Sequence, residues 1–402
     1  MKKKLIIIGG GYGGIRAMQG LSSVKELDIV LIDQNPYHYL QTEAYALIAN
    51  EVSLTDVTVD LVALCKRYEN TEYKKAAVRE IDLIARKVKS DELELDFDYL
   101  IIAAGSRTDF PTSIAGLEQY SHGVKTLQRA FEFKQQFEFQ LYERMQSEED
   151  LFCKAFNVVI GGAGLSGVEI AAEMGHYAKQ FIHDNRMLCE GIQIYLIASR
   201  DKVLDGMHPY MQSKTEKCLD ELGVKVLYNT RITEVKEDAV LLDNGTRIGF
   251  DFMIFAGGVK ASALAHSLGC PLNKKGQVKV DETLQVTCHK NVYAIGDVAA
   301  LVDLSGKVIP ATANAAEQSA GVVVKNIKAQ LKGERPQQAF IGLQGMMVAL
   351  GGRNAAVVLF NTFKVSGLLG HLLKKAITWR YKYRLDSHAL KAYEMMQKEL
   401  KR

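Results

Sequence analysis

Short, continuous apolar runs alternate with helix-like segments along most of the chain. The first run, KLIIIGG at residues 4–10, has the unbroken hydrophobicity of a strand that is buried on both faces of a parallel sheet. A helix-like segment follows it, and a second apolar run, DIVLID, ends at Asp33. This order predicts a strand–helix–strand unit of the kind that builds dinucleotide-binding domains.

The same pattern recurs at a fixed interval. In the later run NVVIGGAGLSG, Gly162, Gly164 and Gly167 each lie 153 residues after Gly9, Gly11 and Gly14. The runs FDYLIIAAG, from Phe97, and FDFMIFAGG, from Phe250, keep the same interval. Two features that share one offset indicate an internal repeat. The predicted fold class is therefore α/β, with two Rossmann-like dinucleotide-binding domains.

A third apolar run, NVYAIGDVAAL at residues 291–301, lies outside both copies. It is typical of a strand that returns to the first sheet, so the second repeat is predicted to be inserted within the first. The expected boundaries place the first domain at 1–115 and 281–340, the second at 116–280, and a C-terminal region at 341–402. Asp297, at the end of this run, either accepts hydrogen bonds from the sugar chain of a cofactor or caps the next helix.

The C-terminal region has a different pattern. Residues 340–360 predict short strands or loops, and from Val365 apolar residues recur at helical spacing, in the pairs Leu368/Leu369, Leu372/Leu373 and Ala376/Ile377. The cations Lys374, Lys375, Arg380, Lys382 and Arg384 cluster toward the end of this segment, with Trp379, Tyr381 and Tyr383 between them. We expect an amphipathic basic helix that docks the C-terminal region on a membrane surface as a peripheral anchor; packing on the body of the protein and contact with a second copy of the chain stay open. No apolar run approaches the roughly 18 residues that would span a bilayer.

Charge and cysteine content narrow the class of protein. Residues 364–402 hold ten Lys+Arg and three Asp+Glu, or +7, which leaves 40 minus 44, or −4, on the preceding residues. The basicity belongs to the tail, which argues against a general nucleic-acid-binding protein. The cysteines, at positions 65, 153, 189, 218, 270 and 288, form no CxxC or CxxxxC pair, so we expect reduced thiols and no metal or dithiol site.

Each glycine turn has the spacing that a nucleotide pyrophosphate requires. Gly9 permits the tight turn, Gly11 lets backbone amides approach the phosphates, and Gly14 lets the helix pack closely on the strand. Asp33, at the end of the next strand, is placed to accept from both hydroxyls of an adenosine ribose. Because turn, helix, strand and acid occur in the required order, a glycine turn that binds nothing is the weaker interpretation.

Together these motifs resemble those of the FAD-dependent pyridine nucleotide reductases, and the whole chain looks most like the type II NADH:quinone oxidoreductases. The matching motifs are GxGxxG with Asp33, AAG at 103–105, the second GxGxxG with Glu169, AGG at 256–258 and AIGD at 294–297. The resemblance implies non-covalent FAD in the first domain, held by Gly9, Gly11, Gly14, Asp33, Ala104, Gly105 and Asp297. It implies NADH or NADPH in the second domain, held by Gly162, Gly164, Gly167, Gly257 and Gly258.

The resemblance also supplies two candidate catalytic residues. Glu169 matches a glutamate that the family places near the nicotinamide and flavin rings, although the helix dipole alone favours an acid in a first helical turn. The segment ANAAEQ matches the family's quinone motif, Ala-Gln-x-Ala-x-Gln, at Ala313, Ala316 and Gln318, with Asn314 where Gln is expected. The shorter amide leaves open an altered quinone position or an ordinary polar start of a helix.

One departure from the family concerns the electron donor. The strand IQIYLIASR should end in an acid that binds the NADH ribose, but this chain has Ala198, Ser199 and Arg200 there. Loss of the carboxylate removes its repulsion toward a 2′-phosphate, which Ser199 and Arg200 could bind, so we hypothesise that NADPH is tolerated or preferred. The alternative is that Arg200 is a solvated loop cation and NADH binds through the glycine turn.

The predicted function follows from the resemblance. Hydride is expected to pass from NAD(P)H to FAD, and two electrons from FAD to a membrane quinone, without proton pumping, at the cytoplasmic side of the cell membrane. Three alternatives remain: a sulfide:quinone oxidoreductase-like flavoprotein, a soluble reductase of a protein acceptor, and a non-catalytic flavin-binding membrane module. The absence of a CxxxxC pair in residues 38–53 disfavours dithiol chemistry, and the lack of a cysteine after Cys288 disfavours sulfide oxidation.

Overall fold

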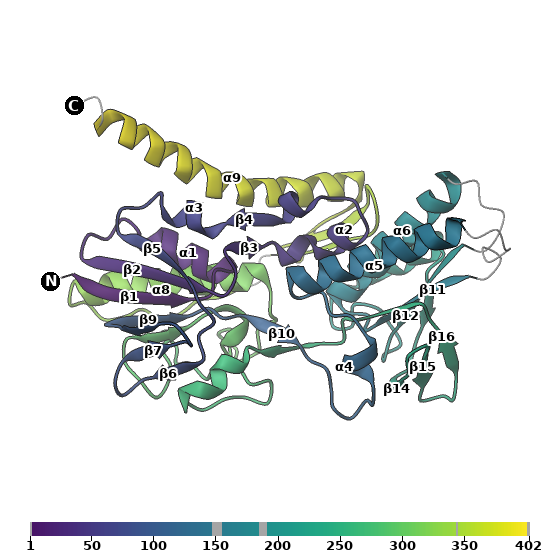
Figure 1. Cartoon of the computed structure of the whole chain (residues 1–402), viewed down its shortest axis with the longest axis horizontal. Coiled ribbons are helices and arrows are strands. Elements are labelled where there is room, and N and C mark those ends of the chain that lie inside the picture. The colour runs from purple at the N-terminus through teal and green to yellow at the C-terminus, as the bar shows by residue number, and fades with distance from the viewer. Residues whose placement is uncertain (1, 147–154, 185–190, 343–344, 400–402) are drawn as a thin grey trace.

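Two parallel sheets form the body of the protein (Figure 1). The structure is a computed structural model that describes residues 2–146, 155–184, 191–342 and 345–399. The first sheet has the order β19-β9-β1-β2-β5 and the second the order β13-β12-β11-β17. Their strands are β1 (Lys3–Ile8), β2 (Leu27–Asp33), β5 (Thr71–Lys75), β9 (Tyr99–Ile102), β11 (Phe156–Gly161), β12 (Ile192–Ile197), β13 (Lys225–Leu227), β17 (Phe252–Phe255) and β19 (Val292–Ala294). The predicted fold of two Rossmann-like sheets is confirmed.

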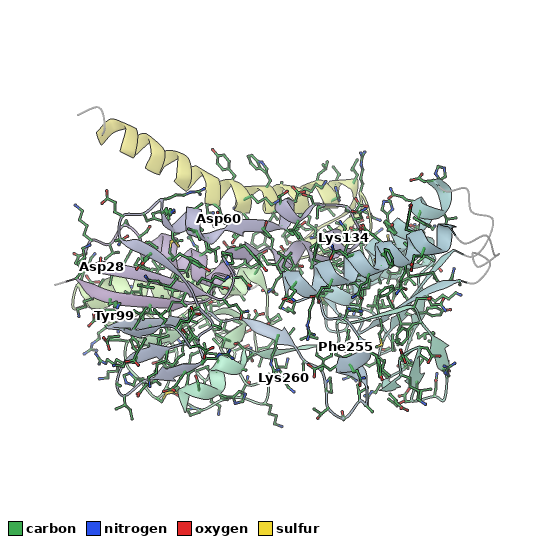
Figure 2. The ribbon with its side chains drawn as sticks, viewed as in Figure 1. Asp28, Asp60, Tyr99, Lys134, Phe255 and Lys260 are labelled. Carbon is green, nitrogen blue, oxygen red and sulfur yellow. A yellow bond between two sulfur atoms is a disulfide. The ribbon has the colours of Figure 1, made fainter. Side chains whose placement is uncertain are left out.

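The second sheet is inserted between strands of the first. β19 pairs in parallel with β9, although every strand of the second sheet lies between these two in the chain. A short antiparallel pair, β10 (Ser106–Thr108) with β18 (Val259–Ala261), connects the two halves. Lys260 of β18, labelled in Figure 2, forms an ion pair with Asp109 at 2.7 Å. The boundaries expected at residues 115/116 and 280/281 remain a prediction.

The 153-residue repeat is visible in the elements themselves. β11 begins and ends 153 residues after β1, and β17 begins and ends 153 residues after β9. The helices that follow the two turns, α1 (Tyr12–Leu21) and α6 (Leu165–Asp184), also start 153 residues apart. All four strands are buried, as the continuous apolar runs predicted.

Helices cover these sheets and contribute most of the remaining core. α1 packs against α8 beside the first sheet, and α6 packs on β12 and against α2 in the second half. Within the first half, Leu5–Ile8 and Leu100–Ile102 lie at the centre of one large apolar cluster. The other helices of the body are α2 (Ala44–Ile48), α3 (Leu61–Cys65), α4 (Leu117–Tyr120), α5 (Leu127–Gln146), α7 (Pro209–Glu221) and α8 (Ala313–Leu331).

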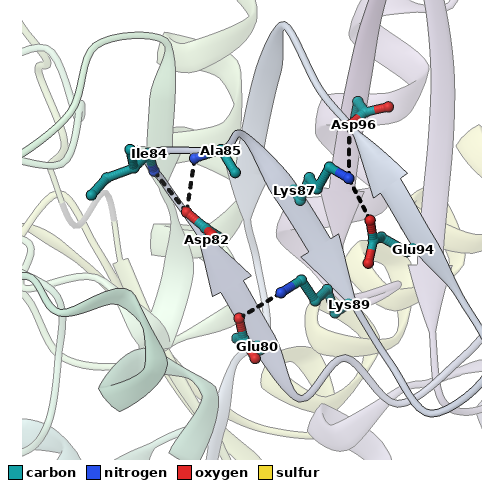
Figure 3. A network of polar contacts seen from close by, with 8 residues as sticks. All are labelled: Glu80, Asp82, Ile84, Ala85, Lys87, Lys89, Glu94 and Asp96. Carbon is teal, nitrogen blue, oxygen red and sulfur yellow. Dashed lines mark hydrogen bonds and ion pairs between the residues drawn. The ribbon is translucent and has the colours of Figure 1, made fainter.

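Both halves also contain small antiparallel sheets. Among them, β6 (Glu80–Asp82), β7 (Lys87–Lys89) and β8 (Glu94–Asp96) carry a surface ladder of charges, in which Lys89 pairs with Glu80 and Lys87 with Glu94 (Figure 3). Such exposed pairs add little stability. The remaining short strands are β3 (Tyr37–Tyr39), β4 (Thr58–Asp60), β14 (Ile232–Val235), β15 (Ala239–Leu242) and β16 (Arg247–Gly249).

The C-terminal region consists of a three-stranded sheet and one long helix. The strands are β20 (Gly345–Ala349), β21 (Ala355–Leu359) and β22 (Phe363–Gly367), and the helix is α9 (Leu368–Glu399). The prediction that the helix starts at Val365 is wrong, because Val365 pairs with Val357 in the sheet. α9 runs along one face of the molecule, above α2 at one end and above α3 and β4 at the other (Figure 1). None of the helices in the described part of the chain meets the length and hydrophobicity required to cross a membrane.

The side chains of α9 do not follow the usual division of apolar residues toward the body and polar residues toward solvent. Several of its polar side chains turn inward: Lys374 pairs with Glu169 of α6 at 3.6 Å, and Arg384 pairs with Glu317 of α8 at 3.3 Å, whereas Lys375 and Arg380 are exposed. Of the five clustered cations, Lys374 and Arg384 thus form ion pairs with acids of the body. The large apolar side chains of Leu368, Leu369, Leu372, Trp379 and Tyr383 point to solvent.

The prediction that all six cysteines are reduced thiols is wrong for one pair. Cys270 and Cys288 form a disulfide, because the intervening segment folds back on itself and brings their Cα atoms to 5.9 Å. Cys65 and Cys218 are free and buried, whereas Cys153 and Cys189 lie outside the described residues.

Candidate functional site

The first glycine turn has the geometry of a phosphate-binding loop. Gly9 has a φ of +106°, and a side chain there would lie 2.3 Å from the Ala103 carbonyl oxygen. A Cβ at Gly14 would come within 1.8 Å of the Gly9 carbonyl oxygen, so α1 can follow β1 this closely only with glycine. No atom lies within 4 Å of the Cβ position of Gly11. The N-terminus of α1 is therefore open for a pyrophosphate at the point where Gly11 precedes it.

Asp33 lies beside this turn, as the sequence predicted. Its Oδ2 accepts a hydrogen bond from the backbone N–H of Gly10 at 2.6 Å, and its Oδ1 accepts from the N–H of Asn35 at 2.8 Å. Burial raises the pKa of Asp33, and these two hydrogen bonds oppose that rise. Each carboxylate oxygen retains capacity to accept from a ribose hydroxyl.

Asp297 lies at the same edge of the first sheet, in the turn that follows β19. Its Oδ2 accepts from the Ser106 hydroxyl at 2.5 Å and lies 3.4 Å from the Lys125 ammonium. Ser106 directly follows Ala104 and Gly105, and Gly105 has a φ of +66°. Sequence reasoning missed Ser106 and Lys125. Ser106 could have been found from its place after the AAG motif, whereas no local pattern marks Lys125.

Helix α8 begins under this site. Its first turn is capped by the Thr312 hydroxyl, which accepts from the Ala315 N–H at 3.2 Å, and Ala313 is its first residue. Buried Ala316 lies under the turn of β19, where a Cβ on Gly296 would come within 3.1 Å of the Ala316 methyl. Small side chains in this helix thus let it pack closely against the segment that carries Asp297.

Gln318 has a different setting from the one expected of a quinone ligand. Its amide nitrogen donates to the Gly342 carbonyl at 2.8 Å, and its amide oxygen accepts from the Gly342 N–H at 3.1 Å. The same nitrogen also donates to Asn314. The amide therefore holds the segment after α8 in place, and a direct contact between Gln318 and a quinone remains a prediction.

The second glycine turn reproduces the first. Gly162 has a φ of +108°, and a Cβ there would lie 2.7 Å from the Gly257 Cα. A Cβ at Gly167 would come within 1.8 Å of the Gly162 carbonyl oxygen, and no atom lies within 4 Å of the Cβ position of Gly164. Gly258 follows at the end of β17, where its carbonyl accepts from the Asp109 N–H at 3.0 Å. The second sheet thus also presents an open helix N-terminus to a phosphate group.

The end of β12 carries no carboxylate at its last buried position. Ala198 is buried there, and its backbone N–H donates to Leu227 at 2.8 Å. Ser199 and Arg200 follow on the surface, where the Arg200 guanidinium lies 3.7 Å from the Asp205 carboxylate. Both members of that pair are more than half exposed, so the ion pair holds Arg200 weakly.

Glu169 lies at the junction of both halves and the tail. Its Oε1 accepts from the Ala349 N–H at 3.0 Å and lies 3.6 Å from the Lys374 ammonium. Lys374 also donates to the Tyr45 hydroxyl and lies over the Tyr45 ring, 4.4 Å from its centroid. Burial raises the pKa of Glu169, and the Lys374 charge opposes that rise. Sequence reasoning found Glu169, whereas Lys374 was named only as one of a cluster of cations in the tail.

A second buried acid lies one helical turn beyond Glu169. Glu173 accepts from the Gly352 N–H at 2.9 Å, and burial raises its pKa to about 7. Glu169 and Gln318 are thus both bonded to the backbone that follows α8, at Ala349 and Gly342 respectively. Within the described ranges, no cluster of His, Cys, Asp and Glu is arranged to hold a metal ion.

The two turns fit the cofactors that the resemblance implies, because each offers open backbone at a helix start. The first also has an acid at the end of its second strand, and the buried Tyr39 hydroxyl has no hydrogen-bond partner among the described residues. Bound there, FAD would supply the capacity to accept a hydride and release electrons.

Comparison with known proteins agrees with this geometry. The family model for pyridine nucleotide-disulphide oxidoreductases matches residues 3–320. Demethylphylloquinone reductase NdbB of Synechocystis is 28% identical, over 97% of this chain and 94% of that protein. A type II NADH:quinone oxidoreductase of Staphylococcus saprophyticus is 23% identical, over 97% of both chains.

A solved structure supports the same conclusion about the fold. NDH2 from Plasmodium falciparum in complex with NADH superposes with a TM-score of 0.86 at 17% sequence identity, covering 99% of this chain and 98% of that one. The resemblance to flavoprotein reductases of the type II NADH:quinone oxidoreductase kind is confirmed by these matches. The chain belongs to the pyridine nucleotide-disulphide oxidoreductase family.

Proposed function

We propose that the chain is an FAD-dependent NAD(P)H:quinone oxidoreductase that works at a membrane surface. The observation that carries this proposal is the pair of matching glycine turns on two sheets, with Asp33 and Asp297 at the first. The names of the relatives, a demethylphylloquinone reductase and a type II NADH:quinone oxidoreductase, support quinone as the acceptor. The absence of proton pumping and a position on the cytoplasmic side of the membrane stay predictions.

The side chains around Glu169 would manage protons and charge. A quinone takes up two protons with its two electrons, so the site needs a group that holds a proton near its ordinary working pH. Glu169 is the candidate for this role, because burial raises its pKa and the neighbouring Lys374 charge opposes that rise. Lys374 further contacts Tyr45 and lies 4.0 Å from Glu43, which links α6, α2 and α9 at one point.

The start of α8 would form the acceptor side of the site. Ala313 and Ala316 have small side chains, so the helix can pack closely against the turn that carries Asp297. The N-terminus of this helix favours negative charge. Gln318, bonded on both amide atoms to Gly342, would position the segment leading to Ala349 and so to Glu169. We therefore propose that Gln318 positions Gly342, and a direct contact between its amide and a quinone stays a prediction.

The tail helix supports a membrane surface as the place of reaction. Its inward face makes polar contacts through Lys374, Thr378 and Arg384, and its outward face exposes Leu369 to 67% and Trp379 to 65%. A soluble helix has the opposite arrangement, with apolar side chains toward the body. Exposed leucines, and Trp379 stacked on Tyr383 at 5.2 Å, suit the interface between acyl chains and headgroups. A homodimer interface on this face remains a prediction.

We propose NADPH as an accepted donor. Ala198 places a methyl group where the family's acid would repel a 2′-phosphate, and the neighbouring Arg200 is held only by an exposed ion pair. The guanidinium can therefore turn from Asp205 to a phosphate at little cost.

The described cysteines argue against a sulfide:quinone oxidoreductase. Burial raises the pKa of Cys65 to about 12 and raises the pKa of Cys218, which keeps both as unreactive thiols. Cys270 and Cys288 are bonded to each other.

Turnover with defined donors and acceptors tests the activity. Under anaerobic conditions, the yellow holoprotein is expected to lose its flavin absorbance on addition of NADH or NADPH and to regain it with a soluble quinone. A protein that stays yellow with both donors, or that is reoxidised by ferredoxin and not by quinone, would contradict the proposal.

Vesicle binding tests the membrane surface. Replacing Leu369 and Leu372 by Ser is expected to lower partitioning onto anionic vesicles by more than about tenfold, because each exposed leucine loses its transfer to the lipid. Ile84→Ser is the matched control: Ile84 is 96% exposed on the β6–β7 turn, on the side opposite α9 (Figure 1). Equal sedimentation of the two variants with vesicles would refute docking through α9.

A further inference from the structure

Three aromatic rings connect α9 to the first glycine turn. The Tyr381 hydroxyl lies 3.1 Å from Nε2 of His38, and the Tyr381 ring packs on Tyr12 with centroids 5.0 Å apart. Tyr12 and His38 meet edge to face at 4.7 Å. These residues come from α9, α1 and β3, so three segments that are distant in the sequence meet in one small cluster.

The inner members of this cluster belong to the turn itself. Tyr12 directly follows Gly11 and is the first residue of α1, and its hydroxyl is bonded to Thr42 at 2.8 Å. His38 is buried and shares a backbone hydrogen bond with Gly10. Gly10 in turn donates its N–H to Asp33. A shift of His38 or Tyr12 would therefore move both the backbone amides and the acid of the proposed FAD site.

The hydrogen-bond directions are fixed by the protonation state of His38. Burial lowers the pKa of His38 to about 3, so the ring is neutral and has one donor and one acceptor nitrogen. The backbone bond that raises this pKa is one in which the ring donates to the Gly10 carbonyl, which leaves Nε2 to accept from the Tyr381 hydroxyl. The chain of bonds thus runs from α9 through His38 to Gly10.

We propose that Tyr381 is a positioning residue for FAD, through which the docked tail helix holds the first glycine turn in its binding geometry. The inference rests on the proposed function only in assigning FAD to this turn. Release of α9 from the body would remove the Tyr381 contact and loosen the pyrophosphate site. The helix that faces the membrane would then also control how firmly the flavin is retained.

Tyr383 provides a matched control within the same helix. It lies two residues beyond Tyr381 but is 52% exposed, and its ring stacks on Trp379 at the surface. Substitutions of Tyr381 and Tyr383 change helix propensity and composition equally, so a difference between them reports the inward contact alone.

Flavin release from the purified holoprotein tests the proposal. Its rate is measured from the rise in flavin fluorescence after dilution into flavin-free buffer. Tyr381→Phe is expected to speed release about fivefold through loss of one hydrogen bond, and Tyr381→Ala by about 30-fold or more through loss of the ring as well. Tyr383→Phe and Tyr383→Ala are expected to stay within about twofold of the parent protein.

A merely structural role of Tyr381 would give a different result. The bond between Tyr381 and His38 is present without flavin, so Tyr381→Phe is expected to lower the apoprotein's free energy of unfolding in urea by about 1 kcal/mol. Ile194→Val, a core substitution in β12, is the control for a stability loss of that size. Equal release rates for the Tyr381 and Tyr383 variants would overturn the proposal, as would release from Ile194→Val as fast as from Tyr381→Phe. Because release is measured without donor or acceptor, failure of quinone turnover would leave this result unaffected.

Discussion

The two repeats agree in their turns and differ in what surrounds them. Gly14 and Gly167 pack against Gly9 and Gly162 with the same geometry, yet α1 has 10 residues and packs on α8, whereas α6 has 20 residues and reaches α2 and β20. At the 153-residue offset, Arg16 and Gly20 of α1 become Glu169 and Glu173 of α6. The backbone of the nucleotide site is thus duplicated intact, while the outer face of the following helix carries different chemistry in each repeat.

The two repeats also differ at the end of their second strand, which is β2 in the first repeat and β12 in the second. In the first repeat, Asp33 lies against the turn and accepts from Gly10, whereas Ala198 gives the second repeat a neutral end followed by Arg200. The two nucleotides would therefore be held by turns of the same geometry. The side chain that selects the nucleotide would be Asp33 in the first repeat and Arg200 in the second. Substitutions in each repeat test these differences.

The largest effect is expected where a methyl group is added to either turn. Gly14→Ala and Gly167→Ala each place a Cβ 1.8 Å from a carbonyl oxygen, so each turn must distort. Gly14→Ala should yield protein with little bound flavin. Gly167→Ala should retain the yellow colour but lose more than about 100-fold in the rate of flavin reduction by NADH or NADPH. Flavin content and stopped-flow absorbance separate the two outcomes. Loss of flavin from both variants would contradict the assignment of FAD to the first turn and of NAD(P)H to the second.

A smaller effect is expected at the end of β12. Ala198→Asp restores an acid that repels a 2′-phosphate and accepts from ribose hydroxyls, so kcat/KM should fall about tenfold or more for NADPH and rise for NADH. Arg200→Ala should weaken NADPH use alone, and Lys202→Ala, an exposed cation in the same loop, serves as its control. Steady-state kinetics with both donors would refute the proposal if the ratio of the two kcat/KM values did not change.

Much of this comparison could be predicted from the sequence because its determinants are local. Unbroken apolar runs predicted the buried strands, and glycine spacing predicted the turns to the residue. The side-chain contacts of α9 could not be predicted. An apolar stripe at helical period indicates one face but not which neighbour covers it, so Lys374 and Tyr381 gave no sign that they point inward. The Cys270–Cys288 bond likewise depends on the folding of the segment between them.

The smallest effect on turnover, and one confined to stability, is expected at Glu173, where the first repeat has Gly20. Its pKa of about 7 lies above the 4.5 of an unfolded chain, so folding favours the protonated carboxyl. The stability that the neutral acid provides is complete below about pH 4.5 and is lost as the pH rises through 7. Glu173→Gln keeps the acceptor for Gly352 but cannot ionise, so relative to the parent its free energy of unfolding should rise by about 1–3 kcal/mol from pH 5 to pH 8.

Urea unfolding across that pH range measures the difference, with the exposed Glu237→Gln as the control that should show no trend. If the free energy of unfolding of Glu173→Gln differed from that of the parent by the same amount at every pH, Glu173 would be ionised in the folded protein. In that case the carboxylate is stabilised by its surroundings, and the second helix carries two charged acids where the first carries none. If the predicted slope is found, Glu173 is a buried neutral neighbour of the pair formed by Glu169 of α6 and Lys374 of α9, and its substitution leaves turnover unchanged near neutral pH.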